Sequence, residues 1–279
     1  MKCAWQHLIQ LLPQRCREEV DRLGKQALQE LRLRMNAEPE LIFQNSSQWL
    51  EYKTTPDDIS FVINSASRYS PWSASTIRRG YITAAGGHRI GLCGEAIMQN
   101  GEMTGVRNPV SLCIRVARDF PGIAARAKNL AGSILIIGGP GSGKTTLLRD
   151  LIRQRSEAGP GSIAVVDERA ELFPIHDQAQ CFYPGKRTDV ITGCSKEHGI
   201  DSLLRTMGPS CIAVDEITAE ADCRALLNAG WSGVTLLATA HANSRDDLFA
   251  RPIYRPIINS GLFDKLIIMQ KDKSWKEEL

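Results

Sequence analysis

Regular alternation of apolar and charged residues predicts the first strand of the chain. Between residues 30 and 35 every second residue is apolar, which puts Leu31, Leu33 and Met35 on one face. A period of two residues is typical of a half-buried β-strand. We therefore expect a sheet in the amino-terminal part of the chain, with one face turned toward a core.

A helix is predicted directly after Thr55. This residue can cap a helix, Pro56 suits the first turn, and the next two residues are acidic and favour the positive end of the helix dipole. Four apolar residues then recur at i, i+3, i+4 and i+7, and they predict one buried helical face: Ile59, Val62, Ile63 and Ala66.

Strand-like patterns return between residues 81 and 116, where glycines interrupt them repeatedly. The dipeptide Asn100-Gly101 is a strong hairpin signal, because both residues tolerate the positive φ angles of a two-residue turn. We expect two antiparallel strands that meet there.

The pattern changes between residues 117 and 130. Short apolar runs then alternate with helical segments, at 134–137, 163–166, 211–214 and 234–239. Such alternation is typical of a parallel sheet with helices on both faces. We expect an α/β fold, with a smaller α+β amino-terminal domain at residues 1–128 and a larger domain at residues 129–279.

Residues 225–244 contain no Asp, Glu, Lys or Arg, and a segment of that length could span a bilayer. Gly230 and Gly233 interrupt it, so we expect a helix end, a turn and a buried strand. The first residues do not resemble a signal peptide, and the eight cysteines form no C-x-x-C pair. We therefore expect a cytoplasmic protein without direct membrane insertion.

Residues 138–145 fit the phosphate-binding pattern G-x-x-x-x-G-K-[ST]. An apolar run precedes them and a helical pattern follows, which is the context that the motif requires. We expect Lys144 to reach the β- and γ-phosphates of a nucleotide and Thr145 to hold Mg²⁺. The candidate nucleotide-binding residues are Gly138, Gly139, Pro140, Gly141, Ser142, Gly143, Lys144, Thr145 and Thr146.

The apolar run at residues 211–214 ends in Asp215 and Glu216. In this Walker B arrangement the first carboxylate orients Mg²⁺ and the second can polarise an attacking water. A buried strand with an acidic tip is the alternative interpretation. A glutamate at this place favours ATP hydrolysis over phosphorylation of a small molecule or GTP switching.

Two further strand ends carry polar residues at the edge where ligands bind in open α/β sheets. Asp167 and Glu168 follow the run at 163–166, and His241 follows the run at 234–239. We expect the two acidic residues to lie beside the nucleotide and His241 to take part in catalysis. A single histidine at a strand end is, however, more often structural.

Several segments together resemble the secretion-type ATPases of the type II/type IV secretion superfamily, and within it the stage III sporulation AA family. Residues 202–209 resemble the arginine-bearing helix before Walker B, 228–244 the histidine box, and 166–171 the acidic box. The segments 31–34, 86–94 and 185–190 resemble the sporulation family itself. In two places the chain departs from the superfamily: Trp231 stands where a first histidine is usual, and Thr218-Ala219 replaces an arginine-aspartate pair.

The resemblance implies a RecA-like P-loop ATPase that works with ATP and Mg²⁺ as a homo-oligomeric ring, a hexamer. It implies action on integral membrane proteins of a secretion-like complex at the forespore–mother cell boundary, with the chain on the mother-cell side. In related ring ATPases, arginines of the amino-terminal domain reach the γ-phosphate, so Arg89, Arg115 and Arg118 become candidate catalytic residues. A solvated basic strand face is the alternative.

Two other functions compete with a motor. A nucleic-acid-dependent P-loop ATPase is disfavoured by the formal net charge of only +3 and by the lack of an aromatic and basic binding platform. A nucleotide-gated scaffold with little turnover is disfavoured by Glu216, because a protein that only binds nucleotide needs no general base.

Overall fold

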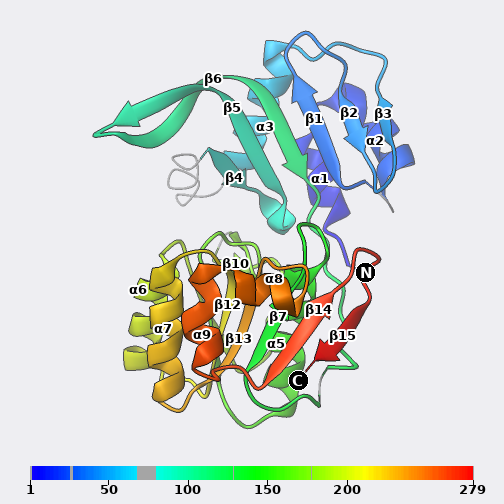
Figure 1. The fold of residues 1–279 in the computed structure, drawn as a ribbon. Helices are drawn as coiled ribbons and strands as arrows, with labels where there is room; N and C mark the ends of the chain where they lie inside the picture. Colours follow the sequence, from blue (N-terminus) through cyan, green and yellow to red (C-terminus); the bar gives the residue numbers. More distant parts are fainter. Residues whose placement is uncertain (1, 26–27, 68–79, 128, 177, 279) are drawn as a thin grey trace. The chain divides into compact units, whose positions relative to one another are not determined.

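The computed structural model describes residues 2–25, 28–67, 80–127, 129–176 and 178–278 (Figure 1). Contacts within the chain divide it into two compact units. The first contains Met1–Asp119 together with Ile175–Phe182, and the second contains Phe120–Pro174 together with Tyr183–Leu279.

The segment 120–127 belongs to the second unit because a helix of that unit holds it. Asp150, in the first helix of the second unit, accepts hydrogen bonds from the backbone N–H groups of Gly122 (3.0 Å) and Ala124 (2.8 Å). The domain boundary that we expected at residue 128 stays a prediction, while the contacts themselves place the start of the second unit at Phe120.

The first unit is built on a six-stranded antiparallel sheet with the strand order β3-β2-β1-β6-β5-β4. The strands are β1 (Glu30–Arg34), β2 (Glu40–Ile42), β3 (Ser47–Trp49), β4 (Tyr81–Thr83), β5 (Arg89–Gln99) and β6 (Glu102–Arg115). In β1, Leu31 and Leu33 are buried while the residues between them are half-buried, which confirms the predicted alternation.

Helices of the first unit share a hydrophobic core with this sheet (Figure 1). They are α1 (Trp5–Leu11), α2 (Gln14–Gly24) and α3 (Pro56–Ser67), with the short 3₁₀ turn η1 (Ala85–Gly87). The start of α3 is capped by Thr55 as predicted, because its hydroxyl oxygen accepts from Asp58 N–H at 3.4 Å, and the Asp58 carboxylate in turn accepts from Thr55 N–H at 2.7 Å. Ile59, Val62 and Ala66 of its predicted face are buried.

The predicted hairpin at Asn100-Gly101 is also confirmed. The two residues join β5 to β6 with φ angles of 52° and 82°. Both angles are in the left-handed region that a tight two-residue turn between twisted strands requires. A smaller hairpin, β9 (Ile175–His176) with β10 (Ala179–Gln180), lies in the segment 175–182.

The second unit is built on a seven-stranded sheet with the order β11-β8-β12-β13-β7-β14-β15. All neighbouring strands are parallel except β15, which is antiparallel to β14. The four central strands are those predicted from the apolar runs. The bounds are β7 (Ile134–Ile137), β8 (Ile163–Asp167), β11 (Thr188–Thr192), β12 (Cys211–Ile217), β13 (Thr235–Ala240), β14 (Lys265–Met269) and β15 (Trp275–Glu278).

Helices cover both faces of this parallel sheet (Figure 1). On one face, α6 (Lys196–Thr206), α7 (Glu220–Trp231) and α9 (Arg255–Asn259) share a core with alternate strand residues such as Ile137 and Val214. On the opposite face, α5 (Lys144–Ala158) buries its own apolar residues. The remaining elements are α8 (Arg245–Ala250) and the 3₁₀ turn η2 (Pro252–Tyr254).

The uncharged window at residues 225–244 forms the end of α7, a turn and the buried strand β13, as predicted. Within the described part of the chain, no helix combines the length and the apolar character that crossing a membrane requires.

Candidate functional site

The phosphate loop connects β7 to α5 and depends on glycine at several positions. Gly141 and Gly143 adopt φ angles of 71° and 99°, which disfavour any residue with a side chain. A Cβ atom on Gly138 would lie 2.6 Å from the Ser142 hydroxyl oxygen and 2.8 Å from the Met269 Cβ. These glycines therefore allow the loop to turn tightly before the first turn of α5. The N–H groups of that turn are available to an anion.

Lys144 begins α5 and turns its side chain back toward the loop. Its Nζ donates to the carbonyl oxygens of Gly138 at 2.9 Å and Gly139 at 3.0 Å, and lies 3.2 Å from His241 Nδ1. The residue is only 7% exposed. Burial lowers the pKa of Lys144, and the nearby charges of Asp215 and Glu216 act in the opposite direction.

Asp215 lies near the carboxyl end of β12, close to two hydroxyl groups. Thr239, on the neighbouring strand β13, donates its hydroxyl hydrogen to Asp215 Oδ1 at 2.5 Å. Burial raises the pKa of Asp215, and the nearby hydroxyl groups of Thr239 and Thr145 oppose the rise. The side chains of Thr145 and Asp215, both proposed to hold Mg²⁺, are thus adjacent.

Glu216 interrupts the regular strand geometry. Its φ is 52°, in the left-handed region, and the pairing of β12 with β13 shifts register between Val214 and Ile217. The backbone N–H of Glu216 donates to the Thr239 hydroxyl oxygen at 2.7 Å. Its carboxylate is contacted on both oxygens, with Oε1 3.1 Å from His241 Nε2 and Oε2 3.2 Å from Arg169 Nη1.

The acidic loop after β8, residues 167–172, is fixed by its first residue. Asp167 is 1% exposed and accepts the backbone N–H groups of Glu171 (2.8 Å), Leu172 (3.0 Å) and Phe173 (2.8 Å). Burial raises its pKa to about 6, although the three hydrogen bonds act to lower it. Because both carboxylate oxygens are already engaged within the loop, a contact of Asp167 with a nucleotide stays a prediction.

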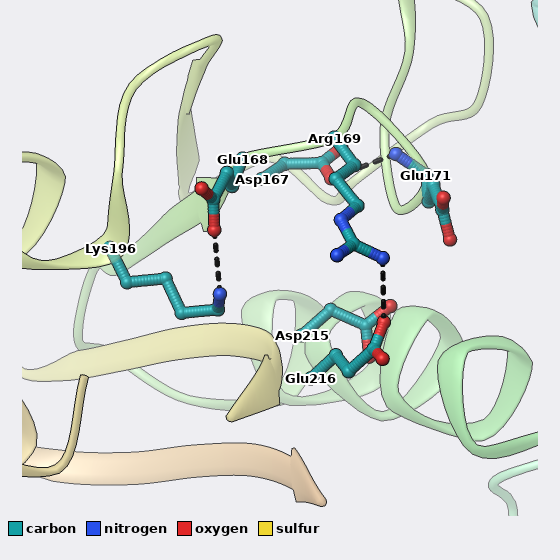
Figure 2. Close-up of a pocket in the computed structure, with 7 residues that line it drawn as sticks. All are labelled: Asp167, Glu168, Arg169, Glu171, Lys196, Asp215 and Glu216. Atoms are coloured by element: carbon teal, nitrogen blue, oxygen red, sulfur yellow. Dashed lines mark hydrogen bonds and ion pairs between the residues drawn. The ribbon is translucent and has the colours of Figure 1, made fainter. Parts of the chain in front are cut away.

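Glu168 anchors the same loop to α6. Its carboxylate lies 2.6 Å from Nζ of Lys196, which is 4% exposed and lies 3.4 Å from Asp222. Figure 2 shows how these groups surround one small pocket. The pocket is lined by Asp167, Glu168, Arg169, Glu171, Lys196, Asp215 and Glu216.

The second unit thus brings together most of the residues that the sequence indicated. The phosphate loop, Thr145, Asp215, Glu216 and His241 meet at the carboxyl edge of the parallel sheet, since β7, β12 and β13 end there side by side. Thr146 lies in the first turn of α5. The roles that we assigned to these residues stay predictions.

The three candidate arginines belong to the first unit and have partners there. The Arg89 guanidinium stacks 3.9 Å from the ring centre of Tyr81, and Arg115 Nε lies 3.3 Å from Glu30 Oε1. Arg118 donates to the carbonyl oxygen of Leu28 at 3.1 Å. Their proposed contact with a γ-phosphate stays a prediction.

Three residues that the geometry places in the site were not predicted from the sequence: Arg169, Lys196 and Thr239. Arg169 stands inside the acidic segment that carries the family resemblance. That segment indicates where Arg169 lies, but it contains no sign of its contact with Glu216. For Lys196 the sequence contains no signal, because a lysine at the start of a helix is normally exposed.

Comparison with known proteins identifies the family. The chain matches the family described as "Sporulation stage III, protein AA" over residues 4–277. Stage III sporulation protein AA of Bacillus subtilis (strain 168) is 34% identical in a comparison that covers 95% of this chain and 91% of that protein. Protein SEEDLING PLASTID DEVELOPMENT 1 of Arabidopsis thaliana is 27% identical over 76% of this chain and 30% of its own length.

Solved structures share the fold at low sequence identity. The pilus retraction motor PilT with bound ADP superposes with a TM-score of 0.62 at 17% identity, over 91% of this chain and 76% of that one. The Legionella pneumophila ATPase DotB superposes with a TM-score of 0.59 at 15% identity, over 93% and 77%. These similarities confirm the predicted α/β, RecA-like fold. Together with the match over residues 4–277, the identity to the Bacillus protein shows that the chain belongs to the stage III sporulation protein AA family.

Proposed function

We propose that this chain hydrolyses ATP with the help of Mg²⁺ and thereby powers or assembles a secretion-like membrane complex during sporulation. The observation that carries the proposal is the set of contacts from Lys144 through His241 to Glu216 beside the phosphate loop. It links a cation that can bind phosphate to a carboxylate that can activate water. The named activities of proteins with this fold, an ATPase and a pilus retraction motor with ADP, also support it.

The residues at the loop fit a nucleotide and its metal ion. Of the buried side-chain polar atoms in the described residues, Ser142 Oγ is one of three without a hydrogen-bond partner, and it lies within the loop. The Lys144 ammonium is held by neutral carbonyl oxygens and a histidine, so it can exchange them for phosphate oxygens. Thr145 and Asp215 offer adjacent oxygen atoms, which are the ligands that Mg²⁺ prefers.

Each side chain then has a role in hydrolysis. The N–H groups of the loop and of the first turn of α5 bind the phosphates, and Lys144 contacts the β- and γ-phosphates. Thr145 and Asp215 would hold Mg²⁺, which neutralises phosphate charge. Glu216 accepts the proton of the attacking water, while His241 contacts both Glu216 and Lys144 and so joins the base to the phosphate-binding lysine.

We propose further that the chain acts as a hexameric ring in the cytoplasm of the mother cell and docks on integral membrane proteins of the complex. In such a ring an arginine of the first unit, from the same or a neighbouring copy, would stabilise charge at the γ-phosphate. Arg115 suits this role, because its side chain is 63% exposed and its ion pair with Glu30 is of a kind that costs little to break. Arg89 and Arg118 are the other candidates.

Two substitutions separate nucleotide binding from hydrolysis. Lys144→Ala removes a charged contact worth about 1.5–3 kcal/mol, so ATP binding should weaken at least about tenfold and turnover should become negligible. Glu216→Gln keeps the shape but loses the base, so ATP should bind as to the parent while hydrolysis falls by about 10²- to 10⁴-fold. Lys276→Ala, at an exposed position of β15, serves as the control and should resemble the parent.

Near-normal hydrolysis by a folded Lys144→Ala protein would exclude the proposal. Hydrolysis that depends on added single-stranded DNA would instead favour the nucleic-acid-dependent ATPase. Tight ATP binding by a parent protein that does not turn over would favour the nucleotide-gated scaffold. Mass measured by light scattering, with and without a non-hydrolysed ATP analogue, tests the ring.

A further inference from the structure

Arg169 is placed to control the side chain of Glu216. It stands in the acidic loop between Asp167 and Glu171 and points toward the carboxylate of Glu216 (Figure 2). Its Nη1 lies 3.2 Å from Glu216 Oε2, while His241 Nε2 lies 3.1 Å from the other oxygen. The two oxygens of this carboxylate are therefore contacted by two different groups, the Arg169 guanidinium after β8 and the His241 imidazole after β13.

An arginine can orient another side chain only if its own backbone is fixed. Here the loop is anchored on both sides of Arg169. On one side Glu168 pairs with the buried Lys196 at 2.6 Å, and on the other side the backbone N–H of Glu171 donates to Asp167. Arg169 is thus presented to Glu216 by a loop with two separate attachments, one to α6 and one to the end of β8.

The backbone of Glu216 does not by itself orient the carboxylate. Its left-handed φ and the hydrogen bond to Thr239 fix where the side chain starts. Beyond that point a glutamate has three rotatable bonds, and the side chain of Glu216 is 28% exposed. A general base must lie within hydrogen-bond reach of the proton that it removes, so contacts on the carboxylate itself are needed.

We propose that Arg169 is a positioning residue that directs the Glu216 carboxylate toward the attacking water. It then governs the rate of hydrolysis and not the affinity for ATP. The proposal rests on the proposed function, and it adds the residue by which the acidic loop acts on the reaction. If Arg169 had only a structural role, its removal would lower stability and rate together. An ion pair whose side chains are 54% and 28% exposed contributes little to folding, so we expect stability to stay unchanged.

The test compares Arg169→Ala, Arg169→Lys and the control Arg22→Ala, whose arginine is 70% exposed on α2. Steady-state hydrolysis gives kcat, and titration with a fluorescent ATP analogue gives Kd. A displacement of about 1 Å in a reacting group costs about a hundredfold in rate, so Arg169→Ala should lower kcat by about that factor with Kd and thermal unfolding unchanged. Arg169→Lys should recover part of the rate, and Arg22→Ala should match the parent.

Four results would overturn the inference. If kcat of Arg169→Ala equals that of the parent while kcat of Glu216→Gln falls as expected, the proposed function stands and this inference falls. If Kd weakens as much as kcat/KM falls, Arg169 binds the nucleotide directly. If Arg169→Ala and Arg169→Lys lose rate only in proportion to their loss of stability, the residue is structural. Near-normal hydrolysis by Glu216→Gln would remove both proposals together.

Discussion

Lys196→Met provides a quantitative test of the charge arrangement around the acidic loop. Lys196 is 4% exposed, and its ammonium lies between Glu168 (2.6 Å) and Asp222 (3.4 Å). Methionine has a similar length and no branching, so the substitution removes the charge without leaving a large cavity. The change in the free energy of unfolding therefore reports mainly on the two carboxylates that lose their cation.

The two carboxylates contribute unequally. The Asp222 side chain is 8% exposed, and removing one partner of a buried ion pair costs about 3–5 kcal/mol. Asp222 nevertheless keeps hydrogen bonds from the backbone N–H groups of Thr218 (2.9 Å) and Ala219 (3.1 Å), which lowers that cost. Glu168 is 34% exposed and can turn to water. We expect a loss of about 2 kcal/mol, and a melting temperature lower by about 4–8 °C.

Urea unfolding of the full chain, followed by circular dichroism, measures this loss. Lys276→Met is the matched control, because Lys276 lies on the surface of β15 and its stability should change by less than about 0.5 kcal/mol. Combining Lys196→Met with Asp222→Asn in a double-mutant cycle should give a coupling of at least about 1 kcal/mol. A Lys196→Met protein as stable as its control, or a coupling of zero, would contradict this prediction.

Two further predictions concern Asp167 and Arg115. Burial raises the pKa of Asp167 from 3.8 to about 6, so the folded state binds this proton more tightly than the unfolded chain does. The free energy of unfolding should therefore fall by about 3 kcal/mol as the pH rises from about 4 to 6. Urea unfolding across this range should show the loss in the parent and not in Asp167→Asn, and identical profiles would contradict the prediction. Arg115→Ala should lower kcat by up to about 10³-fold with little change in ATP binding. Mixing it with Glu216→Gln should restore some activity if the arginine acts on a neighbouring copy, whereas an unchanged kcat would leave Arg115 as a surface partner of Glu30.

Features whose signal is local in the sequence could be predicted. The phosphate loop is a contiguous motif, and the four central strands are contiguous apolar runs whose burial follows from their composition. The turn at Asn100-Gly101 and the cap at Thr55 likewise depend on two or three adjacent residues. Asp215, Glu216 and His241 could be grouped because parallel strands end at one edge of a sheet.

Features that depend on distant partners could not be predicted. The edge strand Thr188–Thr192 is mostly polar and is defined by its pairing with β8. Lys196 is buried only because Glu168 and Asp222 converge on it from two other elements. Thr239 reads as an ordinary strand residue, yet its hydroxyl donates to Asp215 and accepts from the backbone of Glu216. No pattern of local spacing contains this information.

The left-handed backbone conformation of Glu216 costs folding stability, while its side chain is the proposed base. A residue with a side chain pays about 1–2 kcal/mol for this conformation, whereas glycine adopts it freely. Libraries selected only for expression or heat resistance would therefore enrich Glu216→Gly, a substitution that relieves the backbone and removes the proposed base. If Glu216 is the base that we propose, a gain in thermal stability at position 216 would accompany a loss of hydrolysis, and engineering screens would need an activity measurement beside it.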